Sequence, residues 1–161
     1  MKNKMKIEFD AISENEGFAR VAVASFLTGC DPTLEEIADV KTAVSEAVTN
    51  AILHGYSKDL YGGENPKVRI SCWIVEREFG ICVQDDGVGI EDVKKAMEPL
   101  YTGRPELERS GMGFAFMEAF MDNIEVVSEV GKGTSVTMTK TIGRNDTETE
   151  EDQEEKERED L

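Results

Sequence analysis

The chain has 161 residues, of which 39% are hydrophobic, and its formal net charge is −16 at pH 7. This length and composition suit a single globular domain. No apolar run approaches the ~20 residues of a membrane span and no signal sequence follows Met1, so we expect a cytoplasmic protein with no membrane partner. The negative charge argues against nucleic acid as a partner, because phosphates would be repelled.

The acidic residues are concentrated near the C-terminus. Asn145 to Leu161 contains ten acidic and two basic residues, a net charge of −8, and no apolar residue precedes Leu161. Such a segment cannot bury a core. We therefore predict one domain over residues 1–143 and an acidic, disordered, solubilising tail over residues 144–161. The three cysteines form no CxxC motif, which favours reduced thiols over a disulfide or a zinc site.

Hydrophobic spacing predicts one strand and two helices in the first third of the chain. The strand covers Met5 to Ile12, and the first helix covers Glu16 to Thr28. We expect this helix to bury one face, made of Phe18, Val21, Ala22 and Ser25. Thr33 and Glu36 form a capping-box pattern, which begins a second helix that runs to about His54.

The rest of the chain predicts four more strands and two more helices. The strands cover Val68 to Ile74, Ile81 to Asp85, Ile124 to Ser128 and Ser135 to Ile142. A turn covers Arg77 to Gly80, a short helix begins near Glu91, a mobile loop covers Pro99 to Ser110, and a buried helix covers Gly113 to Met121. This order favours an α+β two-layer sandwich with a mixed, mostly antiparallel sheet covered by helices.

The stretch SEAVTNAILHGY, from Ser45 to Tyr56, aligns polar side chains on the second helix. Glu46, Asn50 and His54 are four residues apart and share one face, although most of the stretch is apolar. The carboxylate and the amide are candidate ligand-binding groups. One histidine makes no metal site alone, so we expect His54 to pack against neighbours or to cap the helix C-terminus.

Three glycine clusters are further candidates for a binding site. QDDGVGI follows a strand, RSGMGF opens a helix, and GKGT lies in a hairpin. Glycines let backbone amides approach an anion, and a helix N-terminus favours negative charge. Asp85 ends an apolar strand beside the DGVG turn, where its carboxylate can accept a hydrogen bond from a ligand amino group. The sequence has neither a GxxxxGKS/T phosphate loop nor the HRD and DFG motifs of eukaryotic-type protein kinases.

The order of these motifs resembles that of the GHKL (Bergerat-fold) ATP-binding family. A helical ExxxN, a DxGxG, a loop ending in GxG and a hairpin GT follow one another between Glu46 and Thr134. The resemblance covers nearly Met1 to Ile142 and implies the Bergerat fold, with ATP and Mg²⁺ as cofactors. Within the family, NEGFAR, CDPTLEEI, SEAVTNAILHGY, PELERSGMGF and MEAFMD resemble the sporulation members of the anti-sigma-factor serine kinases, which are single compact domains.

The resemblance implies a role for each matching residue. Glu46 is the implied catalytic carboxylate and Asn50 the implied Mg²⁺ ligand. The implied ATP-binding residues are Asn50, Asp85, Gly87, Gly89, Arg109, Gly111, Gly113 and Thr134. In this scheme Asp85 reads adenine with the Thr134 hydroxyl nearby, and the last glycine pair faces the phosphates. Arg109 meets phosphate or partner charge, or it is simply a solvated arginine of the loop.

The implied function has two activities. The family binds and inhibits a sigma factor, here sigma F of sporulation, and phosphorylates a serine of an anti-anti-sigma factor with ATP; it forms homodimers. Glu16 and Arg20 in NEGFAR are the implied partner-binding residues, although an ordinary exposed i, i+4 pair remains the alternative. Two other functions stay open: a general-stress anti-sigma-B kinase, and an ATP-switched binding module without kinase activity.

Overall fold

The computed structural model describes residues 1–56, 64–98 and 113–143. The elements follow in the order β1 Lys2–Asp10, α1 Glu14–Leu27, α2 Leu34–Asn50, β2 Lys67–Val75, β3 Glu78–Asp85, α3 Val93–Ala96, α4 Gly113–Phe120, β4 Asn123–Glu129 and β5 Gly133–Thr141. A 3-10 turn, Thr28–Cys30, follows α1, and a π-helix, Ala51–Gly55, continues α2. The predicted loop Pro99 to Ser110 and the predicted tail lie outside the described residues.

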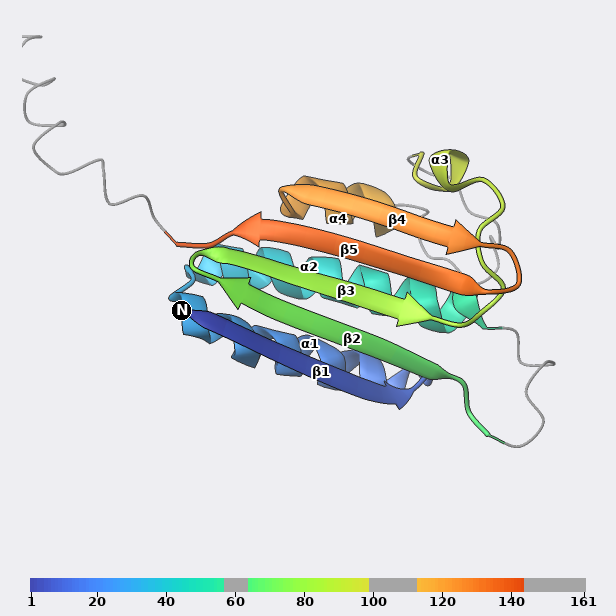
Figure 1. Ribbon diagram of the computed structural model, residues 1–161, viewed down its shortest axis with the longest axis horizontal. Helices are drawn as coiled ribbons and strands as arrows, with labels where there is room; N and C mark the ends of the chain where they lie inside the picture. The colour runs from blue at the N-terminus through green and yellow to red at the C-terminus, as the bar shows by residue number, and fades with distance from the viewer. Residues whose placement is uncertain (57–63, 99–112, 144–161) are drawn as a thin grey trace, which may run out of the picture.

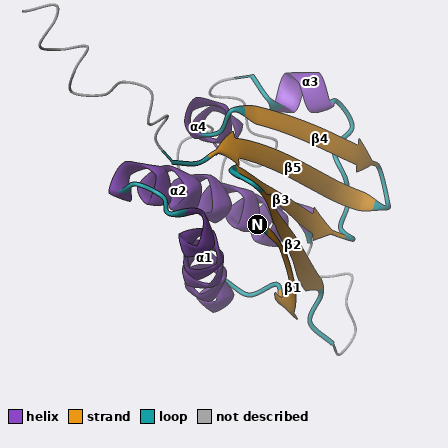
Figure 2. Cartoon of the chain, turned by 60° about the vertical axis from the view of Figure 1, so that its left-hand side comes forward, coloured by secondary structure: helices purple, strands orange, loops and turns teal. Residues whose placement is uncertain are grey.

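The strands form one sheet in the order β1-β2-β3-β5-β4, and all four described pairings are antiparallel. Figures 1 and 2 show α1, α2 and α4 together on one face of this sheet, and the described residues place no helix on the other face. The predicted α+β sandwich with a mostly antiparallel sheet is confirmed. The parallel pairing that would make the sheet mixed is not found among the described residues.

The core lies between the sheet and α2. Alternate residues of β2 are buried, namely Val68, Ile70, Cys72 and Ile74, as in a strand with one face on the core. The facing side of α2 buries Val40, Ala43, Val44, Ala47 and Val48, at the spacing of a single helix face. α2 is the central helix, because it packs between α1 and α4. Polar side chains of α2 can reach a ligand only beyond the ends of these two helices.

The predicted buried face of α1 is wrong. Ala19, Val23 and Leu27 are fully buried, whereas Phe18 is 57% and Val21 is 62% exposed. The helix is apolar on two sides, so its spacing alone does not select the inward one. Packing against α2 selects the side with the small Ala19, which leaves two large apolar side chains facing solvent.

The β2–β3 hairpin is tighter than predicted. β3 begins at Glu78, so Gly80 lies inside the strand and the turn is reduced to Glu76 and Arg77, with Glu76 at a φ of 55°. Gly80 pairs with Trp73, and a Cβ on Gly80 would lie 2.0 Å from Trp73 Cε2. The indole therefore lies over the glycine, and this contact extends the strand through a residue that favours turns.

Glu36 joins the start of α2 to the end of the domain. The N–H of Thr33 donates to Glu36 Oε2 at 2.8 Å and the N–H of Glu36 donates to Thr33 Oγ1 at 3.2 Å, which confirms the predicted capping box. The N–H of Gly143 also donates to Glu36 Oε1, at 3.0 Å. The Glu36 carboxylate thus caps α2 and also accepts a hydrogen bond from the residue that follows the end of β5 by two positions.

We expect Glu36→Ala to lower the free energy of unfolding by about 1–2 kcal/mol, because it removes the reciprocal half of the cap. Glu36→Gln should recover most of this loss, because its amide oxygen still accepts both N–H groups. Denaturant unfolding of the three proteins measures the difference. Equal destabilisation by alanine and glutamine would show that the charge of Glu36, and not its hydrogen bonds, matters.

Candidate functional site

Two helices bring a carboxylate and an amide together at one corner. Glu46 and Asn50 lie one turn apart on α2, and Gly113 is the first residue of α4. A Cβ on Gly113 would lie 3.2 Å from Asn50 Nδ2, 3.3 Å from Asn50 Oδ1 and 3.3 Å from Glu46 Oε2. The N-terminus of α4 therefore adjoins both predicted polar groups, and a larger residue at 113 would crowd them.

The residues that continue α2 lead from Asn50 to Asp85. After Asn50 the helix widens into the π-helix Ala51–Gly55, a form that recurs at functional sites. A Cβ on Gly55 would lie 2.8 Å from both Cγ and Oδ1 of Asp85. The backbone of Gly55 therefore contacts the Asp85 carboxylate. The helical segment that begins with α2 and carries Glu46 and Asn50 thus ends next to Asp85, at the end of β3.

The DGVG turn is fitted closely to the helix end. The N–H of Val88 donates to the carbonyl of Gly55 at 2.7 Å, and a Cβ on Gly87 would lie 1.5 Å from that same oxygen. Gly89 has a φ of 75°, in the left-handed region that favours glycine, and its open side faces the carbonyl of Glu129 at the end of β4. Both predicted glycines are thus required by close backbone approach.

Asp85 is the one buried charged side chain in the described part of the chain, with 7% of its surface exposed. Burial raises its pKa to about 6, and the backbone N–H groups of Gly87 and Thr134 oppose that rise. The N–H of Gly87 donates to Oδ1 at 2.9 Å. The carboxylate is therefore ionised at neutral pH and retains acceptor capacity for another donor.

Thr134 lies directly beside Asp85. The two residues pair between β3 and β5, and Thr134 Oγ1 is 2.8 Å from Ser128 Oγ of β4. Ser128 also accepts the N–H of Ile90 at 2.7 Å. The two hydroxyls thus tie the glycine turn to the β4–β5 hairpin next to the buried carboxylate.

Two residues that our sequence interpretation missed hold this corner. The Tyr56 hydroxyl accepts the N–H of Asp86 at 2.8 Å and donates to the carbonyl of Lys67, so it links the ends of β3, β2 and α2. Arg69 donates from Nη1 and Nη2 to both oxygens of Asp86, each at 2.6 Å, and this pair lowers the pKa of Asp86. Asp86 is thereby held outward while Asp85 points inward. The β2–β3 register could have indicated Arg69, but Tyr56 has no motif.

The other predicted site residues lie elsewhere. Arg109 and Gly111 are outside the described residues. His54 lies in the π-helix, as expected for a residue near the helix C-terminus. Glu16 and Arg20 lie on α1, where Arg20 Nη1 is 3.6 Å from Glu16 Oε1. The part of the chain that the structure describes contains no cluster of three or more metal-ligating carboxylates, histidines or cysteines.

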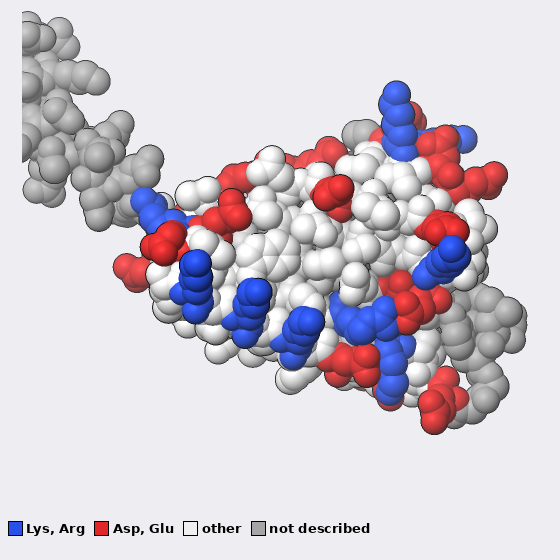
Figure 3. All heavy atoms as spheres, viewed as in Figure 1, with Lys and Arg blue, Asp and Glu red and all other residues white. Residues whose placement is uncertain are grey.

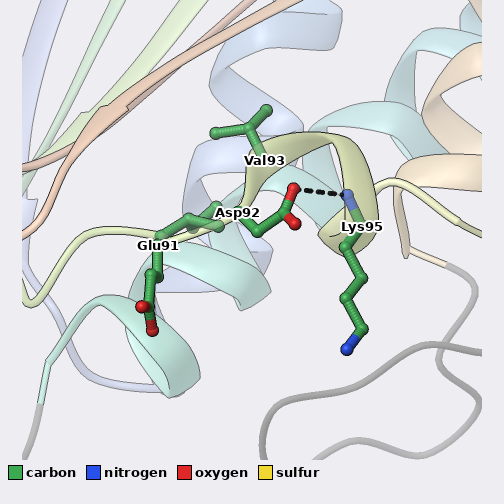
Figure 4. Close-up of a pocket in the computed structure, with 5 residues that line it drawn as sticks. Glu91, Asp92, Val93 and Lys95 are labelled. Atoms are coloured by element: carbon green, nitrogen blue, oxygen red, sulfur yellow. Dashed lines mark hydrogen bonds between the residues drawn. The ribbon is translucent and has the colours of Figure 1, made fainter.

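A separate hollow lies beside the short helix α3. Its lining residues are Ile90, Glu91, Asp92, Val93 and Lys95. Figure 4 shows the carboxylate of Asp92 accepting the backbone N–H of Lys95, at 3.0 Å, which caps the helix. None of the predicted site residues that the structure describes is among these lining residues, and Ile90 lies next to the glycine turn of the site.

Comparison with known proteins decides the family. The sequence model of the histidine kinase-like ATPase domain matches residues 11–140. The chain belongs to this ATPase family. The matched range includes every described residue of the candidate site, from Glu46 to Thr134. It confirms the family resemblance that the order of the motifs indicated.

Relatives within the family are close over nearly their full lengths. An anti-sigma F factor of Oceanobacillus iheyensis is 54% identical over 147 residues, 91% of this chain and 98% of the relative. An anti-sigma F factor of Clostridium acetobutylicum is 63% identical over 140 residues, 87% of this chain and 94% of the relative. Among solved structures, the RsbU and RsbW domains of a Mycobacterium tuberculosis protein match with a TM-score of 0.61 at 20% identity, over 88% of this chain and 33% of that one. The similarity to this solved structure supports the α+β sandwich fold of the chain.

No helix within the described ranges is both long enough and apolar enough to cross a bilayer.

Proposed function

We propose that this protein is an anti-sigma factor and an ATP-dependent protein serine kinase. It binds and inhibits a sigma factor, sigma F, and phosphorylates a serine of an anti-anti-sigma factor. The observation that carries the proposal is the continuous path along α2, which joins Glu46 and Asn50 beside Gly113 to Gly55 against Asp85. The names of relatives more than 50% identical over nearly their whole lengths support sigma F as the partner.

ATP fits this path with its base at one end and its phosphates at the other. The ionised Asp85 can accept a hydrogen bond from the adenine amino group, with Thr134 beside it and the backbone of Gly87 and Gly89 close by. The N-terminus of α4 at Gly113 offers backbone N–H groups and a positive dipole to the phosphates. Arg109 and Gly111, from the sequence motif, complete the proposed phosphate contacts.

The residues present also fit Mg²⁺. The amide oxygen of Asn50 is an oxygen ligand of the kind Mg²⁺ prefers, and a site with one protein ligand leaves the remaining positions to phosphate oxygens and water. When bound there, Mg²⁺ would neutralise phosphate charge. Glu46 is on the same helix face one turn away, and we assign its carboxylate a different task.

In the proposed transfer Glu46 accepts the proton of the acceptor serine. The serine oxygen forms a bond to the γ-phosphorus as the bond from that phosphorus to the β–γ bridging oxygen breaks, which yields phosphoserine and ADP. An enzyme of this kind contributes mainly position and charge. The close placement of Glu46, Asn50 and the α4 N-terminus supplies both.

The deciding experiment incubates the protein with γ-labelled ATP, Mg²⁺ and candidate anti-anti-sigma proteins, and then maps the labelled residue. Label on one serine of a candidate is the expected result. ATP binding and sigma binding without any label would favour the ATP-switched binding module. Labelling and sigma binding with general-stress partners alone would favour the anti-sigma-B kinase.

The pKa of Asp85 predicts how ATP affinity depends on pH. A hydrogen bond from the adenine amino group favours the ionised carboxylate, so ATP binding should lower a pKa that is about 6 in the free protein. Affinity is then highest above pH 6 and falls as the pH drops through it, by about tenfold between pH 7 and pH 5. Calorimetric titration checks this. Asp85→Asn should bind weakly, with little pH dependence over that range; the same steep dependence in Asp85→Asn would assign the titration to another group.

The exposed side of α1 supports a partner-binding surface. Phe18 and Val21 are large apolar side chains more than half exposed on one side of the helix, and Arg20 lies on an adjoining side with 42% of its side chain exposed. Aromatic side chains and arginine are both enriched at protein interfaces. We propose that this surface receives the sigma factor through Arg20 and Glu16, in a homodimer of the chain.

Arg20→Ala should weaken sigma-factor binding at least tenfold, about 1.4 kcal/mol, and leave ATP affinity unchanged. The loss comes from an interface anchor and not from folding, because half of the side chain is solvated and its pair with Glu16 is long, at 3.6 Å. Titration of the dimer against core sigma factor measures it, with Lys94→Ala on α3 as an exposed control. Unchanged affinity in Arg20→Ala would reduce the pair to an ordinary surface contact.

A further inference from the structure

Three lysines line one edge of the sheet, on the face where the described residues place no helix. Lys2, Lys4 and Lys6 alternate along the edge strand β1, so their side chains share that face, and all three are exposed. Figure 3 shows basic side chains in a row over this strand. We call these three residues the lysine row.

The lysine row lacks the carboxylates that accompany its neighbours. Its partners in the β1–β2 register are Val75, Trp73 and Ser71. Within the described ranges none of the three lysines forms an ion pair, whereas Lys67 pairs with Asp10 and Arg69 pairs with Asp86. Neighbouring lysines of the row are two strand residues, about 7 Å, apart, and no ion pair among the described residues neutralises them. The acidic residues Glu8 and Asp10 continue the same face beyond Lys6, and Asp10 pairs with Lys67.

The end of β5 lies in register with the start of the lysine row. Thr141 pairs with Glu78, Glu78 with Val75, and Val75 with Lys2, so one line across the sheet joins the two ends. Three strand spacings separate them, roughly 14 Å. The N–H of Gly143 is held by Glu36, which anchors the chain just after β5 at this end of the sheet.

We propose that the acidic tail, residues 144–161, binds the lysine row of its own chain. Asn145 to Leu161 carries a net charge of −8, and eighteen residues extend to about 59 Å, well beyond the distance to Lys6. A short tether also holds the tail near the row at an effective concentration on the order of millimolar. The rest of the chain carries the remaining −8 and repels the tail from most other surfaces, so attraction is concentrated at this row.

In this contact the tail acts as an intramolecular polyanion that covers the lysine row. An anionic partner could reach the lysine row only by displacing it. The inference rests on charge and strand register and is independent of the proposed kinase activity, so neither depends on the other's test.

Zero-length carbodiimide coupling of the full chain tests the proposal, because it joins carboxylates only to amines in contact with them. Peptide mapping should find at least tenfold more amide links from the tail to the lysine row than to Lys94, an exposed lysine on α3 that forms no ion pair with another described residue. At 1 M salt, where the Debye length is about 3 Å, these links should disappear. Mixing ¹⁵N-labelled and unlabelled chains should give links within single chains.

The triple variant Lys2→Gln, Lys4→Gln and Lys6→Gln removes the three charges but keeps polar side chains, and it should release the tail. The release is measured as a loss of amide ¹H–¹⁵N shift differences between the full chain and a chain ending at residue 143. Lys94→Gln should leave those differences unchanged. Links spread evenly over all lysines, no links at low salt, or links only between labelled and unlabelled chains would each overturn the proposal. The last result would assign the row to the tail of a second copy.

Discussion

Replacing Glu46 with glutamine is expected to lower the rate of serine phosphorylation at least ~100-fold while ATP binding is kept. The amide has the size of the carboxylate but cannot accept the serine proton. Asn50→Ala, one helical turn away, should instead abolish measurable Mg·ATP binding, because it removes the proposed metal ligand beside the α4 N-terminus. Calorimetry separates the two effects on binding, and a transfer assay with γ-labelled ATP measures the rate.

The pair of variants controls for general damage to the helix. Both substitutions lie on the same face of α2, so a loss of helix structure would reduce ATP binding in each. Wild-type transfer by Glu46→Gln would eliminate Glu46 as the proton acceptor. Full Mg·ATP affinity in Asn50→Ala would move the metal to a different ligand.

Gly87→Ala should have the largest effect on stability. Its Cβ would lie 1.5 Å from the carbonyl oxygen of Gly55, and both groups are backbone, so no side-chain rotation relieves the overlap. The turn must separate from the helix end, which breaks the Val88 to Gly55 hydrogen bond and displaces Asp85. We expect a loss of roughly 3 kcal/mol in the free energy of unfolding and loss of ATP binding.

Gly17→Ala is the matched control. Gly17 lies inside α1 with nothing within 4 Å of the Cβ position, so alanine should raise stability by about 0.5–1 kcal/mol. Denaturant unfolding and ATP titration of both variants make the comparison. A Gly87→Ala protein as stable as wild type would mean that the turn and the helix end are not held together as tightly as their geometry requires.

Much of the site could be inferred from sequence because its signals are local. Four-residue spacing aligned Glu46 with Asn50, the apolar strand led to Asp85, and DGVG indicated a turn with close backbone approach. The structure places these residues on one path, as their order in the chain implied. The Tyr56 hydroxyl could not be inferred in this way, because its partners Lys67 and Asp86 are 11 and 30 residues distant and meet it only through strand register.

The sequence by itself determined the elements whose signals lie within a few residues, such as the alternating strand β2 and the capping box of Thr33 and Glu36. Only the tertiary structure decided features on which local signals are ambiguous. α1 is apolar on two sides, and packing against α2 selected the Ala19 side and left Phe18 exposed. Gly80 favours a turn, but the Trp73 ring across the sheet keeps it in β3. The preferences of single residues for helix, strand or turn differ by about 1 kcal/mol or less. Contacts that bury large side chains contribute more, so they decide the structure where the two disagree.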